Sequence, residues 1–176
     1  SLSGSTSITA GTGVTLDSLN DNTGTIALLS SGGIDGGSGT VLMRAANYAF
    51  GGADRTITTT GVLTIEPDAD ENSFASSFDN QYLNPVSVTG LTLGKSSNAS
   101  AITLSRAISL SGPVSIYGGS IDVNANITAN SGNILLDADT GNTLNQSSTG
   151  ILLDDVITIE TVTSGNLTLI GRSGDT

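Results

Sequence analysis

The sequence predicts an all-β protein built as a parallel β-helix, a solenoid with three short strands in each coil of about 19–24 residues. Two observations support this prediction. From Ala101 to Ala138, short apolar-polar-apolar runs follow one another at a nearly constant spacing. The segments between the runs are rich in Gly and Asn and include Pro113, and these residue types favour tight corners.

Each run is expected to form one strand, because alternation with a period of two is typical of a half-buried strand. The steps between the first residues of successive runs are 6, 6, 7, 6 and 7 positions, so three steps make one coil of 19 or 20 residues. Each run should therefore lie beside the run three later. The predicted inward-facing pairs are Ile102 with Ile121, Leu104 with Val123, Ile108 with Ile127, Leu110 with Ala129, Val114 with Ile134, and Ile116 with Leu136.

An antiparallel meander or β-sandwich is the main structural alternative, since short turns with Gly and Asn also form hairpins. Sandwich strands usually run about five or six residues, with turns every 8–12 residues or so. The runs in this chain last three or four residues and recur every six or seven. Strand length and spacing therefore favour the solenoid.

The same alternation continues outside this region at longer intervals. Examples are 25–28, 41–43, 62–65, 91–93 and 151–153. We therefore expect residues 1–176 to be a single β-helix segment of a longer chain, and residues 66–85 to be an inserted excursion between coils. Phe74, Phe78 and Tyr82 lie in this excursion at i, i+4 and i+8, a spacing that predicts one or two helical turns.

The composition argues against several classes of partner. The chain has a net charge of −11 and only five Lys and Arg residues, which are scattered, whereas neutralising phosphates requires clustered cations. Nucleic acid and anionic membrane surfaces are therefore not expected partners. The sequence has no apolar stretch long enough to insert into a bilayer. Because it has no Cys, disulfides and thiolate metal sites are excluded.

Part of the chain also resembles a known class of repeats. The residues that carry the resemblance are Val-Thr-Gly-Leu-Thr-Leu-Gly-Lys-Ser-Ser-Asn at 88–98, Ala-Ile-Thr-Leu at 101–104 and Ser-Gly-Pro-Val-Ser-Ile-Tyr-Gly-Gly-Ser-Ile at 111–121. Over roughly Gly61 to Ala138 the chain resembles repeats of large bacterial surface proteins related to filamentous haemagglutinin-type adhesins. The resemblance implies a right-handed parallel β-helix, a secreted or cell-surface location in bacteria, and a role as a stalk or adhesive fibre. It supplies no catalytic residues.

The expected function is therefore structural or adhesive and not catalytic. The expected partners are adjoining coils or subunits of the same protein, together with cell-surface glycans. Two alternatives remain open: a self-assembling extracellular filament subunit, and a β-helix that binds or degrades polysaccharide. Against catalysis, the chain lacks His, the commonest general base, and has no Ser/His/Asp set.

Two acidic clusters are candidate calcium ligands, and no other cofactor is expected. Asp68, Asp70 and Asn72 place oxygen ligands at alternate positions, as the first half of an EF-hand loop does. Asp137, Asp139 and Asn142 form a shorter version. Both clusters lack the glycine and the closing glutamate of that loop, so a solvated acidic corner is the simpler interpretation of each.

The aromatic residues of the excursion are the candidate ligand-binding residues. If exposed, Phe74, Phe78 and Tyr82 would form a platform on which sugars stack. Packing against a flank of the solenoid is the alternative, and it is favoured because exposed aromatic clusters are unusual.

Overall fold

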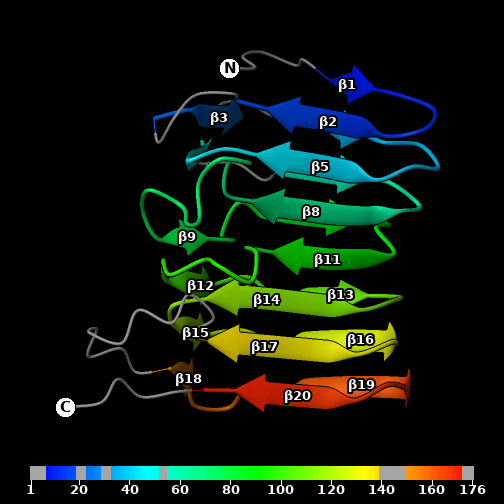
Figure 1. Ribbon diagram of the computed structural model, residues 1–176. Coiled ribbons are helices and arrows are strands. Elements are labelled where there is room, and N and C mark those ends of the chain that lie inside the picture. Colours follow the sequence, from blue (N-terminus) through cyan, green and yellow to red (C-terminus); the bar gives the residue numbers. More distant parts are fainter. Residues whose placement is uncertain (1–6, 19–22, 29–32, 52–54, 139–149, 172–176) are drawn as a thin grey trace.

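The computed structural model describes residues 7–18, 23–28, 33–51, 55–138 and 150–171. These residues form an all-β structure without a helix (Figure 1). The strands are β1 (Ile8–Thr9), β2 (Val14–Asp17), β3 (Thr25–Leu28), β4 (Ile34–Asp35), β5 (Val41–Arg44), β6 (Asn47–Phe50), β7 (Arg55–Thr58), β8 (Val62–Glu66), β9 (Phe78–Asp79), β10 (Leu83–Val86), β11 (Gly90–Leu93), β12 (Ile102–Leu104), β13 (Ile108–Leu110), β14 (Val114–Gly118), β15 (Ile121–Val123), β16 (Ile127–Ser131), β17 (Ile134–Ala138), β18 (Ile151–Leu153), β19 (Ile159–Ser164) and β20 (Leu167–Ile170).

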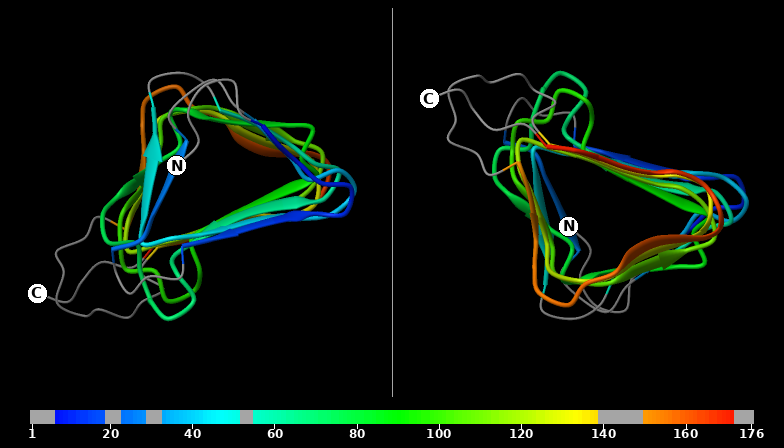
Figure 2. Two further views of the ribbon diagram at one scale, coloured as in Figure 1. Left: turned by 90° about the horizontal axis from the view of Figure 1, so that it is seen from above. Right: turned by 90° about the horizontal axis from the view of Figure 1, so that it is seen from below.

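Every third strand belongs to one seven-stranded sheet, in the order β2-β5-β8-β11-β14-β17-β20. The intervening strands form four shorter sheets, ordered β3-β6, β18-β15-β12-β9, β1-β4-β7-β10 and β13-β16-β19. The strand pairs of all five sheets are parallel, for example β2 with β5 and β17 with β20. Seen along the stack, the chain has a roughly triangular outline (Figure 2). This arrangement of stacked parallel sheets is compatible with a parallel β-helix.

The predicted strand register is confirmed. Ile102 and Leu104 pair with Ile121 and Val123, and the other four predicted pairs also occur as expected. The side chains of all these pairs are at most 3% exposed. The alternation of apolar and polar residues thus points every second side chain inward. The nearly constant spacing places each inward apolar side chain beside an apolar side chain of the next coil.

Coil length is more variable than predicted. Val114 pairs with Ile134, which is 20 positions later, in agreement with the expected range. Val14 pairs with Val41 after 27 positions, and Ile134 with Leu167 after 33, so the predicted upper limit of 24 is wrong for these coils. The additional residues lie between strands, where lengthening a connection costs little free energy.

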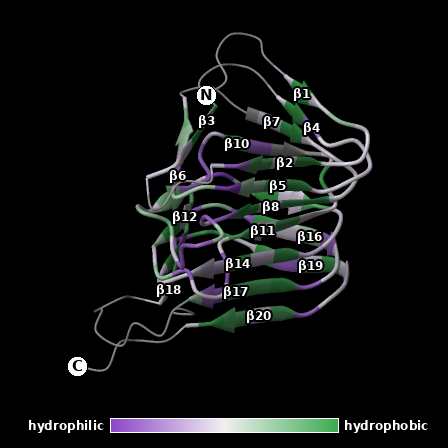
Figure 3. Ribbon diagram, turned by 45° about the horizontal axis from the view of Figure 1, so that its top comes forward, coloured by the Kyte–Doolittle hydropathy of each residue, from purple (hydrophilic) through white to green (hydrophobic). Residues whose placement is uncertain are grey.

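The core is a set of aliphatic columns that run through the stack. In the seven-stranded sheet one column passes through Leu63, Leu91, Val114 and Ile134, and these side chains are 0–2% exposed. Figure 3 shows that the hydrophobic segments lie along the strands, whereas polar segments are common at the corners. Because each coil contacts mainly its neighbours, the buried area accumulates coil by coil.

The corner after β11 ties three coils together through one side chain. Asn98 is fully buried; its Oδ1 accepts hydrogen bonds from the N–H groups of Phe74 (3.3 Å) and Ser100 (3.2 Å). Its Nδ2 donates to the carbonyl oxygens of Tyr117 (2.8 Å) and Ser100 (3.3 Å). Gly94 turns this corner with a φ of +76°, where a β-carbon would also collide with the Tyr117 carbonyl.

The excursion differs from its prediction in one respect. Residues 66–85 contain no helical turn, so the prediction of helical turns is wrong. They contain β9, which pairs with β12, and β10, which pairs with β7. The parts between strands are 67–77 and 80–82. Phe74 and Phe78 are four positions apart, and a bend between them, not a helical turn, brings both rings to the same side.

Candidate functional site

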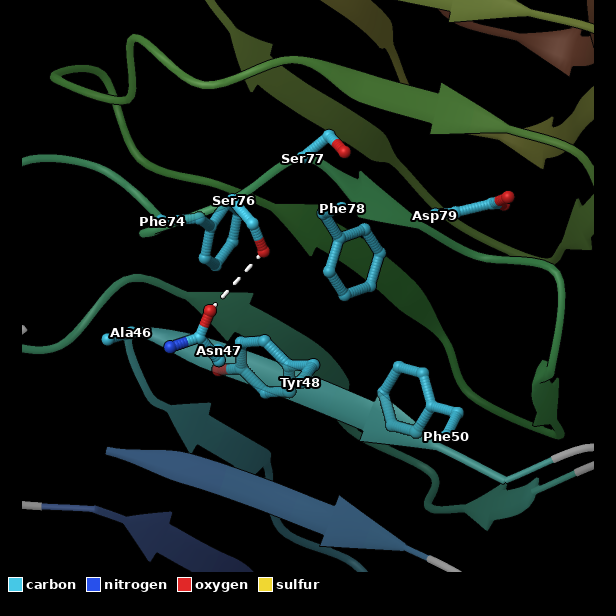
Figure 4. Close-up of a pocket in the computed structure, with 9 residues that line it drawn as sticks. All are labelled: Ala46, Asn47, Tyr48, Phe50, Phe74, Ser76, Ser77, Phe78 and Asp79. Carbon is cyan, nitrogen blue, oxygen red and sulfur yellow. Dashed lines mark hydrogen bonds between the residues drawn. The ribbon is translucent and has the colours of Figure 1, made fainter. Parts of the chain in front are cut away.

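The aromatic residues of the excursion gather at the place where the ladder between β6 and β9 is interrupted. β6 ends the sheet β3-β6, and β9 ends the sheet that continues through β12, β15 and β18. Ala75 N–H donates to the Ala46 carbonyl oxygen (2.8 Å), which holds the excursion beside the start of β6. Figure 4 shows that the rings of Phe74 and Phe78 then lie above those of Tyr48 and Phe50.

These four rings form a packed cluster. The rings of Phe74 and Phe78 are stacked, with centroids 5.6 Å apart and planes inclined by 25°. Tyr48 meets both edge-on, at 5.7 Å from Phe74 and 5.6 Å from Phe78, and Phe50 lies 6.1 Å from Phe78. Such geometries are the favourable ones for aromatic pairs. The cluster fills the gap that the interrupted ladder would otherwise leave.

Phe74 and Phe78 are packed inside the protein and are not presented as a platform. Phe74 and Phe78 are each 4% exposed, so their faces point into the protein. The cavity beside them has a volume of about 30 Å³, and Ser76 Oγ lies 3.3 Å from Asn47 Oδ1 at its edge. This space holds about one water molecule. Tyr82, half-buried, lies in the turn before β10. The geometry of the two phenylalanines supports the packing interpretation.

Tyr48 anchors the cluster to the seven-stranded sheet. Its hydroxyl lies 2.8 Å from the carbonyl oxygens of both Met43 and Glu66, to which it donates. Burial raises the pKa of Tyr48, because the phenolate would lose its hydration there. Tyr48 and Phe50 were not among the candidate residues predicted from the sequence. Their i, i+2 spacing is the alternation of a strand and was the available signal.

A charged ladder crosses three strands of the seven-stranded sheet. Asp17, Arg44 and Glu66 are register partners on β2, β5 and β8. Arg44 Nε donates to Glu66 Oε1 at 2.6 Å, and Arg44 Nη1 lies 3.9 Å from Asp17 Oδ2. The hydrogen bond to Glu66 raises the pKa of Arg44, and the negative charges of Glu66, Asp17 and Asp68 act in the same direction. The guanidinium of Arg44 therefore links its own coil to the coils on both sides.

The first acidic cluster is divided between the interior and the surface. Asp68 is 3% exposed, whereas Asp70 and Asn72 are exposed. The main-chain carbonyl oxygen of Asp68 accepts a hydrogen bond from Lys95 Nζ (2.9 Å), and that of Asn72 accepts one from Ser97 Oγ (3.0 Å). Within the described ranges, no group of three or more Asp, Glu, His or Cys side chains is placed to hold a metal ion.

The second acidic cluster is described only in part. Asp137 lies on β17 in register with Tyr117 on β14 and Ile170 on β20, and it is half-buried. Asp139 and Asn142 lie outside the described residues. Calcium binding at either cluster stays a prediction.

Both ends of the described stack present apolar side chains to solvent. At the first coil, a hollow of about 350 Å³ is lined by residues of β1, β2 and β3, among them Ile8, Leu16, Ile26 and Leu28. At the last coil, Leu153, Leu167 and Leu169 are 46%, 45% and 43% exposed. Figure 1 places β1 to β3 at one end of the stack and β18 to β20 at the other.

Leu167 and Leu169 continue columns whose members in the preceding coils from β5 to β17 are buried. Leu167 pairs with Ile134 and Leu169 with Leu136, and both partners are fully buried. The described part of the chain contains no helix with the length and apolar character needed to cross a membrane. Comparison of the chain with protein-family models, with curated proteins and with solved structures gives no match.

Proposed function

We propose that this chain is a structural, non-catalytic segment of a right-handed parallel β-helix that forms a stalk or adhesive fibre on bacterial surface or secreted proteins. One observation carries the proposal: aliphatic columns run in register through successive coils, from β2 to β20. A stack of this kind grows by adding equivalent coils, so its length is set by coil number. An elongated stack of this kind is suited to the role of a stalk or fibre.

The lateral ties between coils support a mechanical role. The ladder hydrogen bonds of parallel strands join each coil to the next, and the side chains of Asn98 and Arg44 add further links across neighbouring coils. Nearer the last coil, Asn126 Oδ1 accepts a hydrogen bond from Thr158 N–H (2.8 Å), and these two residues directly precede β16 and β19. The partly exposed ion pairs add little stability singly. The buried amide of Asn98 contributes more, because its loss would leave buried main-chain groups unpaired.

The resemblance to filamentous haemagglutinin-type adhesin repeats supports a secreted or cell-surface location and contact with glycans. A lyase that acts on uronates would need a strong base, for which Arg55 and Arg106 are candidates. Arg106 is tied into a corner, where its N–H donates to Asn80 Oδ1 (2.9 Å) and its carbonyl oxygen accepts from Asn80 Nδ2 (2.9 Å). These two hydrogen bonds join the main chain of Arg106 to the side chain of Asn80 at a corner between coils.

Catalytic and structural roles are separated by a uronate-release assay on polygalacturonate and related polymers, with a glycan array run in parallel. We expect no product above that of a heat-unfolded control, whether or not the array detects binding. Product that increases with protein concentration and is lost in Arg106→Ala would overturn the non-catalytic assignment.

Antibodies against the folded chain should label intact cells of the source bacterium, and labelling confined to lysed cells would overturn the proposed location.

A further inference from the structure

The outer face of the seven-stranded sheet carries a continuous row of uncharged side chains. Each strand contributes one outward residue, and the members are register partners from β2 to β20: Thr15, Leu42, Thr64, Thr92, Ser115, Leu135 and Thr168. Most members carry a hydroxyl, so we call this set the hydroxyl row. Figure 1 shows no other described element in front of this face. Because the row runs along the side of the stack, adjoining coils would lengthen it and would not cover it.

The hydroxyls in the middle of the row are not used inside the protein. Those of Thr64, Thr92 and Ser115 make no hydrogen bond to another described residue. Neighbouring members lie about 4.8 Å apart, too far for the roughly 2.5–3.0 Å of an O–H···O bond, so they do not pair with one another. A hydroxyl at a corner differs, since Ser105 Oγ donates to Asp79 Oδ2 (3.0 Å). The hydroxyl row therefore presents regularly spaced donors and acceptors to a ligand.

A second uncharged row lies beside the hydroxyl row, two positions earlier in the chain. Main-chain hydrogen bonds such as that from Val114 N–H to the Asn133 carbonyl oxygen (3.0 Å) set its spacing. Its members are Thr40, Val62, Gly90, Pro113, Asn133 and Asn166. The two rows are about 7 Å apart, and six steps of about 4.8 Å make the hydroxyl row about 29 Å long. Together they form a long, narrow strip without a charged side chain, which we call the neutral strip.

The charge around the neutral strip restricts what it can bind. The net charge of the chain is −11, and Asp17, Glu66 and Asp137 lie two positions after members of the hydroxyl row. Arg44, in the same position on β5, is already paired with Glu66 and Asp17. An anionic polymer would be repelled here.

The size of the neutral strip argues against a second copy of this chain as its occupant. Two copies facing each other would bring together two net charges of −11. A strip about 29 Å by about 7 Å is also far smaller than the roughly 800 Å² that each partner buries in a standard interface. The neutral strip therefore suits a ligand that is linear, narrow and uncharged.

We propose that the neutral strip binds a linear, uncharged polysaccharide that lies along the stack. Sugar hydroxyls exchange hydrogen bonds with the hydroxyl row, and Leu42, Pro113 and Leu135 contact the C–H faces of the rings. An extended chain of pyranose rings advances by about one strand spacing per ring, so each ring lies over about one coil. This inference rests on the proposed function, because it names the class of glycan that such a fibre contacts and the face that contacts it.

Native gel electrophoresis of the chain in gels that contain a dissolved polysaccharide tests the class of ligand. The uncharged probes are hydroxyethyl cellulose, glucomannan and dextran. Carboxymethyl cellulose is the matched anionic probe, since it shares the backbone of the first. We expect at least one uncharged polymer to retard the chain and carboxymethyl cellulose not to retard it. No retardation by any of the three uncharged polymers, or equal retardation by carboxymethyl cellulose, would overturn the proposal.

Two sets of variants locate the contact on the neutral strip. Thr64→Val combined with Thr92→Val keeps the side-chain shapes but removes two hydroxyls, and it should weaken retardation by about fivefold or more. Ser115→Asp places a charge in the strip and should abolish retardation, whereas Ser109→Asp makes the same change on the outward face of β13 and should not. Melting curves establish that the variants fold. Equal effects of the two aspartates, or wild-type retardation of the double valine variant, would overturn the proposal.

Chain length tests whether the ligand lies along the stack. Oligosaccharides of the retarding polymer should compete better as they lengthen, and a hexasaccharide should compete at least about tenfold better than a disaccharide, because it spans more coils. Equal competition would place the contact at a single coil and overturn the proposal, as would dimers in ultracentrifugation that Ser115→Asp dissociates. The proposed structural role fails by different results, the release of uronate product or antibody labelling confined to lysed cells.

Discussion

Replacing Ile121 by Asp tests whether the columns are the source of stability. Ile121 is 1% exposed and lies in register between Ile102 on β12 and Ile151 on β18. Its neighbour Asp122 points outward in register with Thr103, and one carboxyl oxygen of Asp122 lies 3.4 Å from Asn124 Nδ2. Ile121 and Asp122 are therefore neighbours on one strand whose side chains point to opposite faces of the sheet.

The expected loss has two parts. Removing the buried isoleucine side chain costs about 2–3 kcal/mol of hydrophobic free energy. The introduced carboxyl has an ordinary pKa of about 3.9, and burial raises its folded-state pKa, because charging it among aliphatic side chains is unfavourable. If that pKa rises to about 7 or above, ionisation adds about 4 kcal/mol at pH 7, from about 1.36 kcal/mol per unit. A total near 6–7 kcal/mol is comparable with the whole stability of many domains.

The loss should depend on pH with a defined sign. The folded state holds the proton more tightly than the unfolded state, so the variant is least destabilised below about pH 4 and loses about 1.36 kcal/mol more for each pH unit above that, up to its folded-state pKa. Urea unfolding followed by circular dichroism, for wild type and variant from about pH 4 to about pH 7, measures this slope.

Asp122→Ser is the control for Ile121→Asp, and we expect it to change the free energy of unfolding by no more than about 0.5 kcal/mol. Its carboxyl Oδ1 is buried and has no hydrogen-bond partner in the described part of the chain, so little is lost with it. Equal destabilisation by the two substitutions, or a loss at Ile121 that does not change with pH, would refute the assignment of faces.

Three further outcomes are expected. Phe78→Ala should destabilise the chain by about 3–5 kcal/mol, because it empties the aromatic cluster, while Tyr82→Ala should cost about 1 kcal/mol or less in the same denaturation assay; the reverse order would contradict the packing of the excursion. Asn98→Ala should cost about 2 kcal/mol or more, since it leaves main-chain groups of three coils unpaired, and accelerated amide exchange at Phe74 and Ser100 checks the cause. If Asp68, Asp70 and Asn72 share a calcium ion, millimolar calcium should raise the melting temperature and Asp70→Ala should abolish that rise; a melting curve that calcium and chelator leave unchanged would favour a solvated acidic corner.

The regular part of the fold could be predicted from the amino-acid sequence alone. Between Ile102 and Leu136 the runs recur every six or seven residues, and only one pairing then stacks apolar residues on apolar residues while leaving polar ones outside. A shift by one residue would turn the whole inward set to solvent. Because both the period and the spacing are local properties of the chain, the register could be predicted without a structure.

Tertiary structure decided the irregular part. Phe74 and Phe78 have helical spacing, yet Phe78 joins the ladder beside Ile102, and its ring packs on Tyr48, which lies 30 positions earlier in the chain. No local pattern contains that contact. Coil lengths also escaped prediction, since residues added at a corner change neither the columns nor the register.

The exposure of the last coil is likewise a tertiary property. The pattern Leu-Thr-Leu at 167–169 is the same kind of alternation as Ile-Ser-Leu at 108–110, whose apolar residues are 2% and 3% exposed. The sequence marks both pairs of apolar residues as inward-facing. Their burial differs because Ile108 and Leu110 are covered by the coil of β16, whereas Leu167 and Leu169 lie at the edge of the stack. Direction is encoded in the alternation of a strand, but burial requires a neighbouring coil to cover it.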